Sequence, residues 1–172
     1  GLGANAVNSI TTGDYNVGLG GEALTANTEG TGGTAIGFES LKANTTGVGN
    51  TATGYQALYS NTTGANNVAF GKQALYLNST ASYNTALGKS SLKLNTTGDN
   101  NVAVGYISLA SNTTGYRNVG VGQDSLNKNT TGVQNTAIGD RASEANTTGG
   151  DNVAVGNLAL TANTTASNNT AV

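Results

Sequence analysis

Residues 102–118 read VAVGYISLASNTTGYRN, residues 119–135 read VGVGQDSLNKNTTGVQN, and residues 136–152 read TAIGDRASEANTTGGDN. These segments align without a gap, and the same 17-residue pattern runs from Val17 to Asn169 without insertion or deletion. A constant period of this kind is typical of proteins in which each unit stacks on the next. We number the repeat positions as columns 1 to 17, with Val17 in column 1. Residues 1–172 therefore form one uninterrupted array, which we expect to be an excerpt of a longer protein.

The columns show which side chains each position of the repeat accepts. Column 1 holds Val or Thr, column 2 Ala or Gly, and column 3 mostly branched aliphatic residues, an alternation that predicts a short strand. Column 4 is always Gly, which indicates a positive φ or a closely approaching backbone. Column 8 is mostly Leu, which predicts a buried position. The central members are Gly54, Gly71, Gly88, Gly105 and Gly122 in column 4, and Leu58, Leu75, Leu92, Leu109 and Leu126 in column 8.

The distribution of charge predicts which columns face water. Charged side chains occur only in columns 5, 6, 9, 10, 13, 15 and 16. Columns 2 and 7 are small and uncharged in every unit, which favours three or more copies of the chain packed closely side by side. The alternative is that small residues simply fit a tight monomeric coil.

A 17-residue unit with so few large apolar side chains cannot bury a core alone and must stack on its neighbours. The chain has no Asn-Gly dipeptide of the kind that closes antiparallel hairpins. We therefore predict an all-β fold, a parallel β-solenoid (β-roll) of about ten coils spaced by about 4.8 Å. Columns 5 to 10 are rich in helix formers, so a single helical turn and a second strand are both alternatives there.

Asn recurs in columns 11 and 17, and parallel stacking places each Asn over the next. Such amide ladders satisfy their hydrogen bonds along the axis. Column 11 also forms Asn-x-Ser/Thr sequons, which would carry a glycan on every coil if they were exposed. We prefer the buried ladder, because a buried amide cannot accept a glycan. Its central members are Asn61, Asn95, Asn112 and Asn129.

The motif Asn-Val-Ala-Val-Gly at residues 101–105 and 152–156 resembles the head repeat of trimeric autotransporter adhesins. The fuller unit is similar to repeats of bacterial surface proteins and phage tail-fibre-like proteins, and the resemblance covers the whole chain. It implies a left-handed parallel β-roll in an intertwined homotrimer at the cell surface. The 17-residue unit is longer than is typical of those heads, so the number of chains and the coil shape stay open.

The composition removes most classes of enzyme and several classes of partner. The chain has no His and no Cys, so it can form no Ser/His/Asp triad, no Cys nucleophile and no zinc site of thiolates or imidazoles. A net charge of −2 does not indicate binding to nucleic acid, which requires a basic surface. No apolar run is close to the length of a membrane-spanning segment. We expect no enzymatic activity, no metal or other cofactor, no nucleic-acid partner and no membrane contact from this segment.

Aromatic residues are the candidates for ligand contact. Phe38 and Tyr55 share column 5 on successive units, and Tyr59 and Tyr76 share column 9. Exposed rings on a stiff surface stack on sugars or apolar surfaces. The alternative is that the rings pair with each other and stabilise the stack.

These observations predict a structural and adhesive section of an extracellular fibre or surface appendage. We expect it to lie at the cell surface or in a virion tail fibre and to assemble from copies of itself, with a trimer favoured. Its expected contacts are cell-surface glycans or another cell. The alternatives are a carbohydrate- or ice-binding solenoid module and a phage tail-fibre shaft. Against ice binding, adjacent Thr in columns 12 and 13 point to opposite faces if the chain is extended there.

Overall fold

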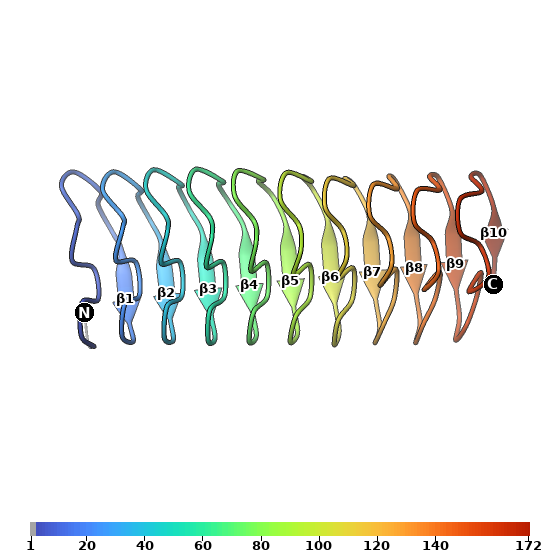
Figure 1. Cartoon of the computed structure of the whole chain (residues 1–172), viewed down its shortest axis with the longest axis horizontal. Helices are drawn as coiled ribbons and strands as arrows, with labels where there is room; N and C mark the ends of the chain where they lie inside the picture. The colour runs from blue at the N-terminus through green and yellow to red at the C-terminus, as the bar shows by residue number, and fades with distance from the viewer. Residues whose placement is uncertain (1–2) are drawn as a thin grey trace.

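The computed structural model describes residues 3–172 and is an all-β solenoid with no helix in that range. All ten strands belong to one sheet in chain order, and each strand pairs in parallel with the next. Their bounds are β1 Val17–Leu19, β2 Thr34–Ile36, β3 Thr51–Thr53, β4 Val68–Phe70, β5 Thr85–Leu87, β6 Val102–Val104, β7 Val119–Val121, β8 Thr136–Ile138, β9 Val153–Val155 and β10 Thr170–Ala171. The strands stand side by side along the axis (Figure 1). The predicted parallel β-solenoid with a 17-residue repeat is confirmed.

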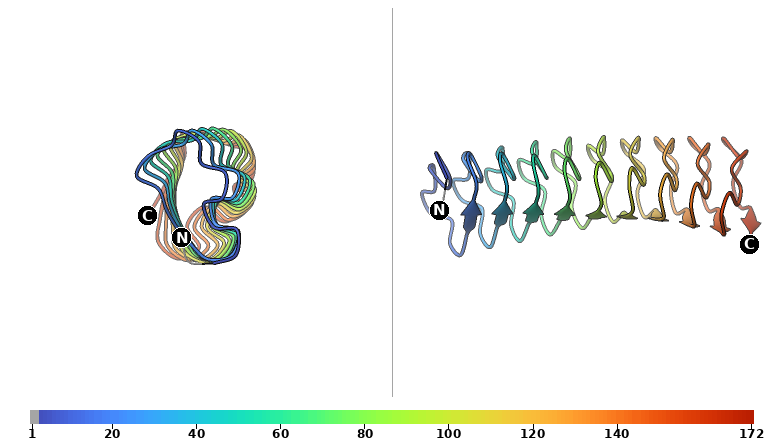
Figure 2. Two further views of the ribbon diagram at one scale, coloured as in Figure 1. Left: turned by 90° about the vertical axis from the view of Figure 1, so that its left-hand side faces the viewer. Right: turned by 90° about the horizontal axis from the view of Figure 1, so that it is seen from below.

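The register of the sheet follows the sequence repeat without a slip. Val102 of β6 pairs with Val119 of β7, and the same 17-residue offset relates every neighbouring pair of strands. The end-on view shows the coils lying nearly one behind another around a common interior (Figure 2). Each column is therefore a continuous row along the axis, which turns gradually because each coil is slightly offset from the one before it (Figure 2).

The interior of each coil is built from small, apolar and amide side chains. The Leu of column 8 is fully buried at Leu58, Leu75, Leu92, Leu109 and Leu126. The Ala residues of column 2 and most of the small residues of column 7 are also buried, for example Ala35 and Ala57. Column 2 and column 7 therefore lie inside a single chain. The tight monomeric coil explains their small size, and this size no longer argues for several chains.

The Gly of column 4 satisfies both conditions that its invariance indicates. At Gly71 φ is +134°, and a Cβ built there would lie 2.6 Å from the carbonyl oxygen of Gly88 on the next coil. An L-residue would thus be strained in φ and would collide with the backbone that stacks on it. Column 4 fixes the axial spacing of the coils.

Columns 5 to 10 form neither the strand nor the helical turn considered for them. Ser90 and Leu92, in columns 6 and 8, have φ values of 58° and 49°, and the same left-handed conformation recurs at these columns along the array. Leu92 donates its backbone N–H to the carbonyl of Ser108 on the next coil, at 3.0 Å. A left-handed residue interrupts a helix, and the backbone instead bonds between coils. Amino-acid composition did not predict this left-handed conformation, because hydrogen bonds between coils impose it on residues that otherwise favour a helix.

Candidate functional site

Two rows of buried Asn run through the solenoid, and the first is column 11. Asn95 donates one Nδ2 hydrogen to Asn78 Oδ1 at 3.0 Å and the other to the carbonyl of Gly98 at 2.9 Å. Its own Oδ1 accepts from Asn112 Nδ2 at 2.8 Å. The same pattern continues through Asn61 and Asn129. The predicted ladder is confirmed, and from Asn44 onward each amide donates both its Nδ2 hydrogens.

The second ladder is column 17, and it bonds backbone as well as side chain. Asn118 donates its backbone N–H to Asn101 Oδ1 at 3.0 Å and its Nδ2 to the carbonyl of Gly132 at 2.8 Å. Asn129 of column 11 donates to that same carbonyl at 3.0 Å. The carbonyl of column 14 therefore joins the two ladders, except at Gly47, where column 17 supplies no amide. Among residues 3–172 no buried side-chain nitrogen or oxygen lacks a hydrogen-bond partner.

Column 17 has one gap, at Gly33. The backbone N–H of Gly33 still donates to Asn16 Oδ1 at 2.8 Å, but no amide side chain links Asn16 to Asn50. A Cβ at Gly33 would meet Asn16 Oδ1 at 3.0 Å and Leu24 at 3.5 Å, so the position is tight but bordered only by side chains. The ladder runs unbroken from Asn50 to Asn169.

Burial decides between the two readings of the column 11 sequons. Asn61, Asn95, Asn112 and Asn129 have no exposed surface, and their Nδ2 atoms are engaged inside the coil. A glycan bonded to such a nitrogen would have to pass through the neighbouring coils. These sequons are therefore structural positions in the folded array.

The four aromatic candidates form two separate stacks. The rings of Phe38 and Tyr55 lie 5.8 Å apart at 16°, and those of Tyr59 and Tyr76 lie 5.1 Å apart at 18°. Phe38 and Tyr55 are exposed, whereas Tyr59 and Tyr76 are half-buried. The structure brings each pair together within its own column, as the sequence predicts.

A lysine covers one end face of each stack. The Nζ of Lys72, on the coil after Tyr55, lies 5.5 Å from the centre of the Tyr55 ring. The Nζ of Lys42, on the coil before Tyr59, lies 5.6 Å from the centre of that ring. Tyr55 and Tyr59 thus each have an aromatic ring on one face and an ammonium group on the other. This geometry supports the pairing alternative, since only ring edges and the outer ring of each stack remain for a ligand.

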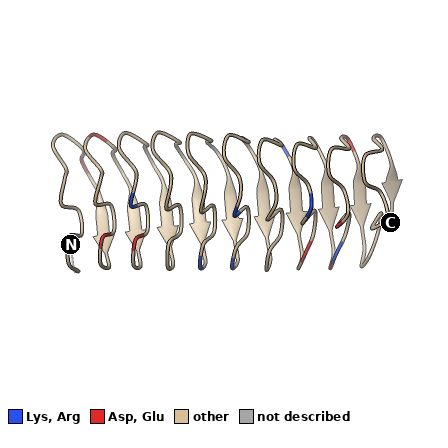
Figure 3. Cartoon of the chain, viewed as in Figure 1, with Lys and Arg blue, Asp and Glu red and all other residues tan. Residues whose placement is uncertain are grey.

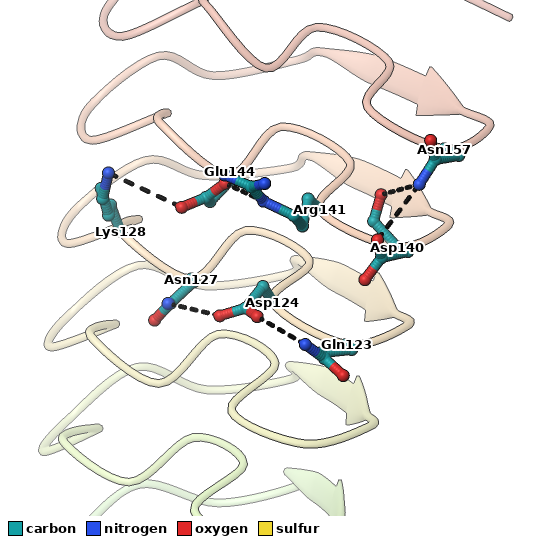
Figure 4. Close-up of polar contacts among 8 residues, drawn as sticks. All are labelled: Gln123, Asp124, Asn127, Lys128, Asp140, Arg141, Glu144 and Asn157. Carbon is teal, nitrogen blue, oxygen red and sulfur yellow. Dashed lines mark hydrogen bonds and ion pairs between the residues drawn. The ribbon is translucent and has the colours of Figure 1, made fainter.

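The charged side chains form short surface networks. Glu144 accepts from Arg141 Nε at 2.7 Å and lies 3.7 Å from Lys128 Nζ, while Asp124 accepts from Asn127 at 2.9 Å (Figure 4). The hydrogen bond from Arg141 lowers the pKa of Glu144. At the other end of the array, hydrogen bonds from Gln56 and Lys42 lower the pKa of Glu39.

A catalytic acid that works near neutral pH needs a raised carboxyl pKa, so these shifts run opposite to that requirement. Within residues 3–172, no three acidic side chains come close enough together to hold a metal ion. The networks are ordinary surface ion pairs, which contribute little to stability.

Threonine columns 12 and 13 differ in what their hydroxyls do. Thr45 in column 12 donates Oγ1 to the carbonyl of Thr62 on the next coil at 3.1 Å, and Thr62 repeats this with Ser79 at 3.0 Å. The neighbouring column 13 residues, such as Thr63 and Thr97, are exposed. Of these two columns only column 13 faces water, so they do not form the paired Thr rows expected of an ice-binding face.

The outward face of the sheet is the largest feature that sequence reasoning missed. In each complete strand the central residue is buried, and the residues of columns 1 and 3 point away from the interior. Phe70 is 59% exposed and Leu19 42%. Charge alone could not identify these columns as outward, because neither contains a charged residue. The sequence signal for their outward direction was that larger residues in columns 1 and 3 alternate with a small residue in column 2, because successive strand residues point to opposite faces.

No protein-family model, curated protein or solved structure matches the chain. The described residues include no helix long and apolar enough to cross a membrane.

Proposed function

We propose that this chain is a structural and adhesive section of an extracellular fibre or surface appendage, assembled from several copies. Its role would be reach, stiffness and attachment to cells or surfaces. The resemblance of residues 101–105 and 152–156 to adhesin head repeats supports the location and the trimeric assembly. The fold by itself is compatible with many functions, so the proposal depends on the physical properties of the array.

The observation that carries the proposal is the pair of amide ladders, which run together without a break from Asn50 to the last coil. Over that range every coil bonds to the next through column 11, column 17 and the sheet, with one register throughout. In repeat proteins stability is a sum of unit and nearest-neighbour terms, so a longer array is a longer rod with the same cross-section. Bending this rod would open several buried hydrogen bonds at once on its outer side. Resistance to bending and a length set by repeat number are the properties a fibre section needs.

The rod is tested by changing its length. A variant in which residues 51–135 are repeated once in register gains five coils, and its contour should grow by about 24 Å without a change of width. Electron microscopy of single particles measures both dimensions. A particle that thickens, bends freely or keeps its length would contradict the fibre proposal.

Attachment needs its own experiment. Beads coated with the chain should attach to cells or to an array of surface glycans above the level of blank beads. The matched variant replaces Phe38, Tyr55, Tyr59 and Tyr76 with Ser, which leaves the buried columns intact. Loss of attachment in the variant would assign adhesion to the aromatic stacks, and retained attachment would move it to another surface of the rod. Beads that attach to nothing would remove the adhesive part of the proposal.

A further inference from the structure

Columns 1 and 3 of β1–β10 form one continuous outward surface, which we call the sheet face. It consists of two parallel rows of side chains along the whole axis. Column 1 contributes Val or Thr, and column 3 contributes Leu, Ile, Val or Phe with a single Thr at position 53. None of the strands carries a charged residue, as the uniformly tan arrows of Figure 3 make visible. The sheet face is therefore uncharged from end to end and mostly apolar, with Thr as its only polar residue.

The fold of the single chain does not require this composition. The side chains of the sheet face point away from the interior, which column 2 fills with Ala or Gly. The other outward rows, apart from the half-buried Thr row of column 12, all accept charged residues. Lys and Glu would suit a solvated sheet surface equally well and would protect it from aggregation. An outward surface that avoids them at every coil is one that another molecule covers.

The sheet face is large enough to be a stable interface. Five large apolar side chains of column 3 are exposed in the single chain, namely Leu19, Ile36, Phe70, Leu87 and Ile138. The ten strands supply ten residues of column 1 and nine of column 3. This number is close to the roughly 20–30 residues that each partner contributes to a standard interface of about 800 Å² per side. Contiguous exposed apolar patches above a few hundred Å² are rare on monomeric proteins.

We propose that the sheet face is the self-association interface of the chain, covered by the sheet face of a second copy. A partner must match the axial spacing of the rows over the full length of the rod, and a second copy has that spacing by construction. It also presents an uncharged apolar surface, so neither sheet buries an unpaired charge. Two sheets that pack in this way lie about 10 Å apart, with the side chains of columns 1 and 3 interleaved. The inference rests on the proposed assembly from several copies and names the surface that performs it, with a face-to-face pair as the unit in place of the trimer that the resemblance implies.

The first test is the mass of the chain in solution. Sedimentation equilibrium of the wild-type chain should give a dimer or a higher oligomer at micromolar concentration. The variant Val104→Lys/Val121→Lys places two charges in the middle of the sheet face, and we expect its dissociation constant to rise at least 100-fold. The matched control Thr97→Lys/Thr114→Lys places two charges in column 13 of neighbouring coils and should associate like the wild type. Equal thermal midpoints of all three chains, measured at concentrations low enough for each to be monomeric, would show that folding is unaffected.

A second test does not depend on disrupting the surface. The chain has no Cys, so Val104→Cys introduces a single thiol at the middle of the sheet face. Mild oxidation should link two copies through this residue, whereas Thr114→Cys in exposed column 13 should stay largely unlinked.

The outcomes separate the inference from the proposed function. A wild-type chain that stays monomeric, or a Val104→Lys/Val121→Lys variant that associates normally, overturns the inference while the length and attachment experiments can still succeed. Equal cross-linking of Val104→Cys and Thr114→Cys also overturns it. Association through the sheet face by a flexible, non-adhesive chain would instead contradict the proposed function.

Discussion

The buried ladders and the sheet face reverse the usual placement of polar and apolar side chains. Inside the coil, Asn112 and Asn118 are fully buried and hydrogen-bonded in every direction. Outside it, Leu19 and Phe70 are exposed to solvent. Between Val17 and Asn169 the two ladder rows hold Asn at every position except Gly33, whereas the rows of the sheet face exchange Val with Thr and Leu with Ile, Val or Phe.

The difference teaches which rows the fold itself fixes. A thin coil has room for one Leu and a few small side chains, so hydrophobic burial contributes only about 2 kcal/mol for each Leu. An amide in the same interior must satisfy all its hydrogen bonds, or each unpaired group costs about 1–3 kcal/mol. Asn is therefore fixed by its partners above and below, while the sheet face is restrained only in excluding charge.

The largest expected loss of stability comes from forcing neighbouring coils apart, because both the buried ladders and the sheet face depend on close stacking. Gly105→Val introduces a β-branched side chain at a φ of +134° and directs it at the carbonyl of Gly122 on the next coil. We expect a loss of more than about 4 kcal/mol in the free energy of unfolding. Denaturant titration measures the loss, and a variant that melts like the wild type would show that column 4 does not set the spacing.

Inside and outside can be compared directly at two neighbouring residues. Leu92→Asp places an unpaired carboxylate among fully buried side chains and should cost about 4 kcal/mol at neutral pH. Lys93→Asp, one residue later in a water-facing column, should change the free energy of unfolding by less than about 0.5 kcal/mol. Thermal melts of the two variants provide the comparison. Similar losses in both would remove the assignment of columns 8 and 9.

The ladder itself is tested by truncating one rung. Asn95→Ala leaves Asn78 Oδ1 without a donor from the next coil and Asn112 Nδ2 without one of its acceptors. The expected cost is about 3 kcal/mol. Thr97→Ala in exposed column 13 is the matched control and should be nearly neutral. If the two variants have equal denaturation midpoints, buried amides do not hold the coils together.

The smallest effect is a gain. Gly33→Asn would place an amide between Asn16 and Asn50 and close the gap in column 17. We expect about 1 kcal/mol of stabilisation from the added hydrogen bonds and from the lost flexibility of Gly in the unfolded chain. The same change at Gly32, where φ is +68° and the position is outside the ladder, is the control. A Gly33→Asn variant less stable than the wild type would mean that the neighbouring Leu24 cannot accommodate the side chain.

Sequence alone predicted the features that repeat with the coil. The invariant Gly71, the buried Leu92 and the Asn95 ladder follow from columns that accept one kind of residue. The conformation of columns 5 to 10 could not be predicted, because left-handed φ values at Leu92 and Ser90 contradict the preferences of those residues and are imposed by inter-coil hydrogen bonds. The small residues of columns 2 and 7 did not distinguish a tight single-chain coil from several chains packed side by side. Both kinds of packing require small side chains.

The candidate site was predictable only in part, for a different reason. The column spacing correctly paired Phe38 with Tyr55 and Tyr59 with Tyr76, because residues 17 apart stack in any parallel solenoid. The lysine contacts that cover these stacks depend on side-chain direction, which the repeat does not specify. The sheet face was not predicted, because outward columns were identified by their charged residues and columns 1 and 3 contain none.

The claim that buried amide ladders hold the coils together is tested most directly by side-chain hydrogen exchange. Both Nδ2 hydrogens of Asn112 are donated inside the coil, at 2.8 Å to Asn95 Oδ1 and at 2.8 Å to the carbonyl of Gly115, whereas Asn100 lies exposed in column 16 of a neighbouring coil. Nuclear magnetic resonance should find exchange at Asn112 at least ~100-fold slower than at Asn100, because release requires the stack to open. Equal exchange at the two side chains would contradict the account.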